Sequence, residues 1–111
     1  MKHLLIALAL GTLVVTIASS ASAQSAADNY KSKCQMCHGA TGNADTPMGK
    51  KLNIRDFHLP EIQQKSDADL FKVISEGVSN QGRVSMPGYK GKITDDQIQE
   101  LVAYVRELGK K

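Results

Sequence analysis

Residues 34–42 read Cys-Gln-Met-Cys-His-Gly-Ala-Thr-Gly, and this stretch decides the fold. It holds both cysteines of the 111-residue chain, separated by two residues, with His38 directly after the second. Three kinds of site use such a group of side chains: a thiol–disulfide centre, half of a zinc site, or a covalent haem anchor. The rest of the sequence has to decide among them.

The N-terminus has the features of an export signal. Lys2 precedes a mostly apolar run from Leu4 to Ile17, and Ala21-Ser22-Ala23 then has small residues where a signal peptidase cuts. The run is shorter than the roughly 20 residues that span a bilayer. We therefore expect a signal peptide at 1–23, export to the periplasm, and one domain at 24–111 that is not inserted in the membrane.

Composition indicates a small core that needs a cofactor. Removing 23 of the 111 residues leaves 88, and losing Lys2 lowers the formal net charge from +3 to +2. That charge is too small to indicate nucleic-acid binding. There is no tryptophan, and small exported domains usually need a disulfide, a metal or a cofactor for stability.

Helix signals dominate residues 24–111 and predict an all-α fold. The predicted helices are 25–38 with Ser25 as N-cap, a short turn at 60–64 that begins with Pro60, 66–77 between the Ser66 N-cap and Gly77, and a last helix from Thr94 to Gly109. The last helix has a capping box, Thr94 with Gln97, and an apolar stripe at i, i+3, i+4, i+7 and i+10 from Ile98. We expect loops at 39–59 and 78–92, which are rich in glycine and polar residues.

The context of the two cysteines favours haem. A thioredoxin-type centre needs a βαβ unit, which the helical pattern lacks, and a zinc site needs four ligands, whereas His58 is the only other histidine in 24–111. A disulfide across two residues closes too small a loop to stabilise a domain. Cys-x-x-Cys-His is the attachment signature of c-type haem. We predict one covalent haem c, with Cys34 and Cys37 on its two vinyl groups and His38 donating Nε2 to the iron.

A metal-bound imidazole needs an acceptor for its other nitrogen. Pro47, nine residues after His38, offers a carbonyl in the glycine-rich loop. The alternative, an ordinary turn proline, stays equally open from spacing alone.

The second axial position has three candidates in 24–111 besides Met36: Met48, His58 and Met86. Met36 is held on the His38 side by the attachment turn. Met86 lies 48 residues beyond His38 and precedes Pro87, which favours an extended backbone there. Met48 is only ten residues from His38, so we expect it to stay on the His38 side of the haem. His58 stands between Phe57 and Leu59, and we expect it to be a surface or hydrogen-bonded histidine rather than a ligand. We favour Met86.

The expected pocket residues around the haem are mostly apolar side chains between the two ligands. They are Leu52, Ile54, Phe57, Leu59, Leu70, Phe71, Ile74, Val78, Val84 and Tyr89, with Leu101, Tyr104 and Val105 behind them.

With these residues in place, the chain resembles the class I cytochromes c, the small monohaem electron carriers, and in particular their short bacterial branch. The resemblance rests on Cys34, Cys37 and His38, on Pro47, and on Met86-Pro87 before a terminal amphipathic helix. It implies that the first and last helices cross and pack, with Tyr30 against Leu101 and Tyr104.

The resemblance also implies a function. We expect a periplasmic one-electron carrier, monomeric and not an enzyme, that exchanges electrons with redox protein partners. Two alternatives remain: a peroxidase-like or gas-binding haem protein with a labile Met86 ligand, and a docked subunit of a larger oxidoreductase.

Overall fold

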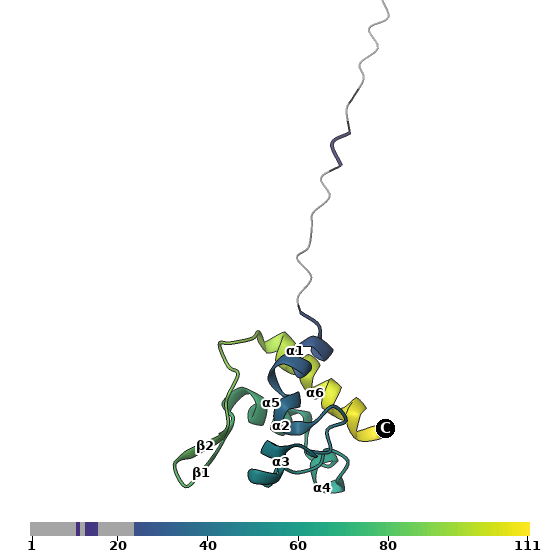
Figure 1. Cartoon of the computed structure of the whole chain (residues 1–111). Coiled ribbons are helices and arrows are strands. Elements are labelled where there is room, and N and C mark those ends of the chain that lie inside the picture. The colour runs from purple at the N-terminus through teal and green to yellow at the C-terminus, as the bar shows by residue number, and fades with distance from the viewer. Residues whose placement is uncertain (1–10, 12, 16–23) are drawn as a thin grey trace, which may run out of the picture.

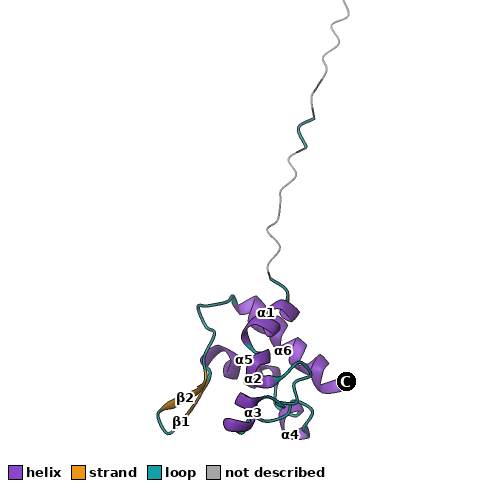
Figure 2. Cartoon of the chain, in the orientation of Figure 1, coloured by secondary structure: helices purple, strands orange, loops and turns teal. Residues whose placement is uncertain are grey.

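The computed structural model describes residues 11, 13–15 and 24–111, so most of the predicted signal peptide lies outside it. Figure 1 shows the helices gathered into one body, from which a two-stranded hairpin extends. No helix within the described residues is long and apolar enough to cross a membrane. The elements, distinguished in Figure 2, are α1 (Ala26–Lys33), α2 (Gln35–His38), α3 (Pro47–Lys51), α4 (Pro60–Gln63), α5 (Asp67–Glu76), β1 (Val78–Asn80), β2 (Arg83–Met86) and α6 (Asp95–Lys110).

The predicted first helix is present but interrupted at Cys34. Ser25 caps α1 by accepting a hydrogen bond from the backbone N–H of Asp28. The backbone then leaves ideal helical geometry at Cys34, with φ −119°, and α2 restarts at Gln35. This interruption lies inside the Cys-x-x-Cys-His stretch, so it sets how the three side chains are presented.

The caps predicted for the longer helices are confirmed. Ser66 accepts from the N–H of Asp69 at the start of α5, Gly77 ends that helix with φ +78°, and Thr94 forms a full capping box with Gln97 at the start of α6. The predicted end of the last helix at Gly109 is wrong, because α6 continues through Lys110. The absence of a side chain at Gly109 instead makes room for Gln63, whose Nε2 would lie 2.2 Å from a Cβ placed there.

The core forms where the first and last helices pack on each other. α1 lies against α6 (Figure 1), and the rings of Tyr30 and Tyr104 meet with centroids 5.0 Å apart. Ile98, Leu101 and Val102 of α6 are almost completely buried. The helix crossing implied by the resemblance is therefore confirmed.

Two parts of the predicted loops have regular structure. In the first loop, Thr46 caps α3 by accepting from the N–H of Gly49, and Pro47 occupies the first turn, a combination that favours a helix start. In the second loop, β1 and β2 pair antiparallel across Gln81 and Gly82, both with positive φ. Two such residues form the two-residue turn that matches strand twist. The hairpin was not predicted because its strands are only three and four residues long and Gln-Gly is a weaker turn signal than Asn-Gly.

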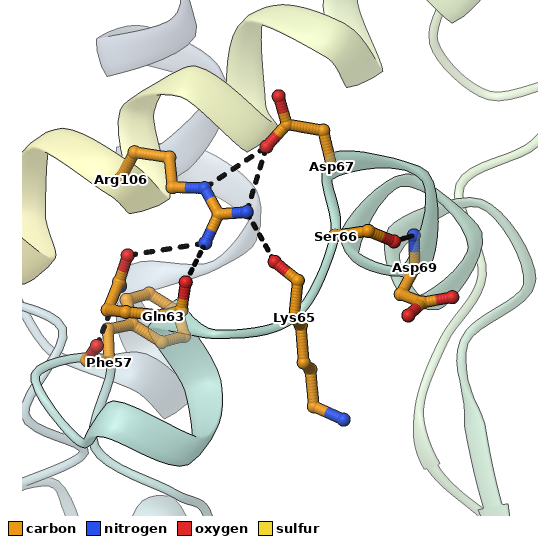
Figure 3. Close-up of polar contacts among 7 residues, drawn as sticks. All are labelled: Phe57, Gln63, Lys65, Ser66, Asp67, Asp69 and Arg106. Atoms are coloured by element: carbon orange, nitrogen blue, oxygen red, sulfur yellow. Dashed lines mark hydrogen bonds and ion pairs between the residues drawn. The ribbon is translucent and has the colours of Figure 1, made fainter.

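Arg106 ties α6 to the connection between α4 and α5 (Figure 3). Its guanidinium donates to the carbonyls of Gln63, at 2.8 Å, and Lys65, at 2.5 Å, and to the carboxylate of Asp67, at 2.9 and 3.1 Å. Gln63 in turn donates from Nε2 to the carbonyl of Phe57 at 2.7 Å. Carbonyls at the end of a helix have no donor within that helix. Arg106 supplies donors at the end of α4 and fixes the 57–67 segment against the last helix.

Replacing Arg106 by methionine should destabilise the fold, because the apolar stem stays while the donors to two carbonyls and one carboxylate are lost. We expect the free energy of unfolding of the haem-loaded protein to fall by about 1–3 kcal/mol, measured by guanidinium titration. Lys110→Met is the matched control, since Lys110 forms an exposed ion pair with Glu107 and its loss should change stability by less than about 0.5 kcal/mol. Equal losses in the two variants would contradict a special role for Arg106.

Candidate haem site

The two cysteines and His38 lie where α1 passes into α2. Both thiols are free and half-buried. Burial raises the pKa of the Cys34 thiol to about 11 and lowers the pKa of the His38 imidazole below its usual value. At neutral pH the cysteine is therefore a thiol and the histidine is neutral, which is the form of imidazole that binds metals.

Hydroxyl groups from the segments on either side hold the backbone of this stretch, each nine residues from the carbonyl that it binds. Thr46 Oγ1 donates to the carbonyl of Cys37 at 2.8 Å, and Tyr30 donates its hydroxyl to the carbonyl of Gly39 at 2.6 Å, in a buried bond. The Thr46 hydroxyl also accepts from the N–H of Gly49, so it joins α2 to α3. These bonds were not predicted, since nothing in the local sequence says which carbonyl such a hydroxyl will reach.

The His38 ring is packed rather than hydrogen-bonded. It stacks on Phe57, with centroids 4.8 Å apart and planes 28° apart. Its Nδ1 is buried and has no hydrogen-bond partner among the described residues. Pro47 lies exposed at the first turn of α3 and makes no hydrogen bond to His38 here. The Pro47 carbonyl as acceptor for a metal-bound His38 therefore stays a prediction.

Two adjoining cavities meet at His38 and Met86. The first, on the cysteine side, is lined by Lys33, Cys34, Cys37, His38, Ile54, Ser85, Met86, Pro87 and Tyr89. The second is lined by His38, Phe57, Ile62, Leu70, Val73, Ile74, Met86 and Val105. The residue that closes the Cys-x-x-Cys-His stretch and a methionine 48 positions later thus share both cavities, and most of the remaining walls are apolar.

The expected pocket residues are partly found in these walls. Ile54, Phe57, Leu70, Ile74, Tyr89 and Val105 line one cavity or the other. Three others point outward, and the exposed fraction is 70% for Val84, 40% for Val78 and 37% for Leu59. Ile62 and Val73 were missed. Val73 could have been found from its i+3 spacing to Leu70 on α5, whereas four-residue α4 gives no periodic signal for Ile62.

The loop at 86–90 is fixed to the end of α5 through the backbone. The N–H groups of Tyr89 and Lys90 donate to the carbonyls of Ile74 and Ser75, both at 3.0 Å. Gly77 and Gly88 allow this approach, because a Cβ on Gly77 would lie 2.4 Å from the carbonyl oxygen of Met86 and one on Gly88 would lie 2.7 Å from the backbone of Glu76. Met86 is thereby presented to the cavities from a close-packed loop.

The other candidate ligands lie elsewhere. Met48 is on α3 with 39% of its surface exposed, and Met36 is 80% exposed. His58 pairs with Asp56, with His58 Nδ1 2.6 Å from the carboxylate oxygen. The hydrogen bond from the His58 backbone N–H, followed by the one to its ring, lowers the pKa of Asp56. None of these three side chains lines either cavity.

The residues present fit haem. Two free thiols lie at one side, the Nδ1 of the half-buried His38 imidazole has no hydrogen-bond partner in the part of the chain that the structure describes, and apolar walls extend from this ring to a thioether. Paired thiols next to an imidazole ligand match the covalent attachment of haem c. Fold and site together define a small c-type cytochrome.

The comparisons agree with this class. The family model described as "Cytochrome C oxidase, cbb3-type, subunit III" matches residues 21–105, and the chain belongs to this family of c-type cytochromes. The cofactor is therefore covalently bound haem c, and the predicted resemblance to the class I cytochromes c is confirmed.

Relatives and solved structures extend the match over most of the chain. Cytochrome c6 of Thermostichus vulcanus is 29% identical over 109 residues, covering 96% of this chain and 88% of that protein. Cytochrome c6 of Leptolyngbya boryana is 29% identical over 82 residues, covering 74% and 87%. The solved structure "KustC0563 c-type cytochrome" is 31% identical with a TM-score of 0.66, covering 77% of this chain and 98% of that one. These matches support membership of a family of electron-carrying c-type cytochromes.

Replacing both Cys34 and Cys37 by alanine should remove covalent haem and, with it, most of the helical structure. The apolar walls around His38 are part of the core. In a chain this small, the fold should be unstable when no haem fills the space between these walls. Haem staining of a denaturing gel reports attachment, and far-ultraviolet circular dichroism reports helix content. A double variant that keeps the wild-type helical signal without haem would contradict this dependence.

Proposed function

We propose that this protein is a periplasmic one-electron carrier in which His38 and Met86 are the axial ligands of its haem. The observation that supports the pair is that both side chains line both cavities, while Met48 and His58 line neither. The pair also fits the chemistry, since imidazole with thioether is the ligand set of electron-transferring c-type haem.

The haem, when bound, supplies an iron that alternates between Fe(II) and Fe(III). Cys34 and Cys37 would anchor its edge, and His38 would bind as the neutral imidazole that its burial favours. Met86 would offer a soft sulfur from a loop that the glycine contacts hold in place. Apolar walls, including Phe57, Leu70 and Ile74, would disfavour the extra positive charge of Fe(III) and so raise the reduction potential of the couple. Little of the protein would have to move when an electron arrives.

The gas-binding or peroxidase-like alternative differs from the carrier in one property, the strength of the bond between the Met86 sulfur and the iron. An iron with two firm ligands favours electron transfer, whereas an open or easily opened position admits small molecules. Carbon monoxide distinguishes them, because it binds reduced iron only where a position is free or readily vacated.

Replacing Met86 by alanine should open the iron. In the oxidised wild type we expect a weak sulfur-to-iron charge-transfer band and, in the reduced form, poor binding of carbon monoxide. Met86→Ala should abolish the band, admit carbon monoxide and lower the potential by a sizeable part of the roughly 0.8 V range that axial ligands control. Visible spectroscopy and a redox titration measure all three.

Met48→Ala and His58→Ala are the controls for this experiment and should leave the band in place. Ready carbon monoxide binding by the wild type, or an unchanged spectrum in Met86→Ala, would reject the ligand pair and favour the gas-binding alternative.

A docked subunit is the second candidate function, because the description of the matching family names an oxidase subunit. A free carrier should be released with the periplasmic fraction as a monomer, with the intact mass of residues 24–111 plus one haem. Mass spectrometry and gel filtration of natively expressed protein test this. Retention of residues 2–23, or recovery only in a large membrane complex, would favour an anchored or docked protein instead.

A further inference from the structure

Tyr89 joins the two parts of the chain that carry the proposed ligands. Its hydroxyl donates to the carbonyl of Lys33 at 3.0 Å, across 56 positions of sequence. Lys33 is the last residue of α1 and directly precedes Cys34, and Tyr89 follows Met86 by three residues. A single hydrogen bond therefore spans from the 86–90 loop to the start of the haem-attachment stretch.

The carbonyl of Lys33 needs a donor because of the interruption at Cys34. In a continuous helix it would accept from the N–H of Cys37. Here the N–H of Cys37 donates to the carbonyl of Cys34 instead, at 3.2 Å. The Tyr89 hydroxyl donates to the Lys33 carbonyl instead. The interruption at Cys34 therefore leaves an acceptor available to the 86–90 loop.

The Tyr89 side chain is suited to this role. Tyr89 lines the cavity that is also lined by Cys34, Cys37 and Met86, and Lys92 Nζ lies over its ring, 5.7 Å from the centroid. Burial raises the pKa of the phenol, which remains a donor across the physiological range. The backbone N–H groups of Tyr89 and Lys90 donate to α5, and the Tyr89 carbonyl accepts from Lys92 and Ile93. Among the described residues, the Tyr89 hydroxyl therefore supplies the hydrogen bond from this loop to the cysteine side.

We propose that Tyr89 is a positioning residue for Met86: its bond to Lys33 holds the 86–90 loop against the attachment stretch and resists displacement of the thioether from the iron. The inference rests on Met86 as the second axial ligand. Only Pro87 and Gly88 separate Met86 from Tyr89, so a movement of the backbone that carries the sulfur away from the cavity pulls on the Tyr89–Lys33 bond. The bond is then present in the Met86-bound form and lost in the displaced form, which shifts the equilibrium between them.

Tyr89→Phe tests this with the ring retained. Tyr30→Phe is the matched control, because it also removes a hydroxyl bonded to a carbonyl of the same stretch, that of Gly39, but has no link to the 86–90 loop. The probe is imidazole, titrated into the oxidised, haem-loaded proteins while the charge-transfer band is followed. We expect Tyr89→Phe to bind imidazole about two- to tenfold more tightly than the wild type, the fold-change that one net hydrogen bond corresponds to. Tyr30→Phe should bind it as the wild type does.

A second measurement separates positioning from a general loss of stability. On heating, the charge-transfer band of Tyr89→Phe should disappear well before its helical circular dichroism, while in Tyr30→Phe both should shift together. Wild-type imidazole affinity in Tyr89→Phe, an equal increase in Tyr30→Phe, or coincident loss of band and helix in Tyr89→Phe would overturn the inference while Met86 ligation stands. A wild type without the band would overturn both.

Discussion

The change of backbone direction at Cys34 is the constraint on which the rest of the structure depends. Cys34, Cys37 and His38 stand at i, i+3 and i+4, which a continuous helix would keep on one face, yet the helix that begins after Ser25 is interrupted at Cys34. The interruption leaves the carbonyl of Lys33 without its usual helical donor, because the N–H of Cys37 donates to the carbonyl of Cys34 instead. Hydroxyls from three separate elements then bind the carbonyls of this stretch, and in doing so they bring the loops after His38 and Met86 to the same place.

What could be predicted from the sequence is what depends on near neighbours. The caps at Ser25, Ser66 and Thr94 were correct because a side-chain oxygen and a backbone N–H three positions on form the whole signal. Gly109 was misread because its reason is a contact with Gln63, 46 residues earlier in the chain, rather than a helix end. The short helix at 47–51 does carry local signals, the Thr46 cap and Pro47, but these stand in a loop rich in glycine and polar residues. The hairpin at 78–86 has short, mostly exposed strands, which leave little apolar alternation to detect.

The site divides in the same way. Cys34, Cys37 and His38 could be predicted because their spacing is the attachment signature of c-type haem, and Met86 because it lies far from His38 along the chain and precedes a proline. His38 and Met86 line the same cavities, which is compatible with their predicted role as ligands. The ring that stacks on His38 and the hydroxyl that reaches Lys33 could not be predicted, since both Phe57 and Tyr89 read locally as ordinary apolar residues in loops. Which carbonyl serves a metal-bound His38 depends on the ring's orientation, and spacing does not encode that orientation.

The hairpin has a consequence for how such a protein can be adapted. Its turn at Gln81 and Gly82 is exposed, and a side chain added at Gly82 would meet no other atom within 4 Å. Yet the second strand ends at Met86, which faces the cavities. Exposed loop tips are where insertions are tolerated best. Lineages or designers can therefore lengthen, shorten or label this tip, and so reshape the surface next to the redox centre, while the packed helices that hold the centre stay unchanged.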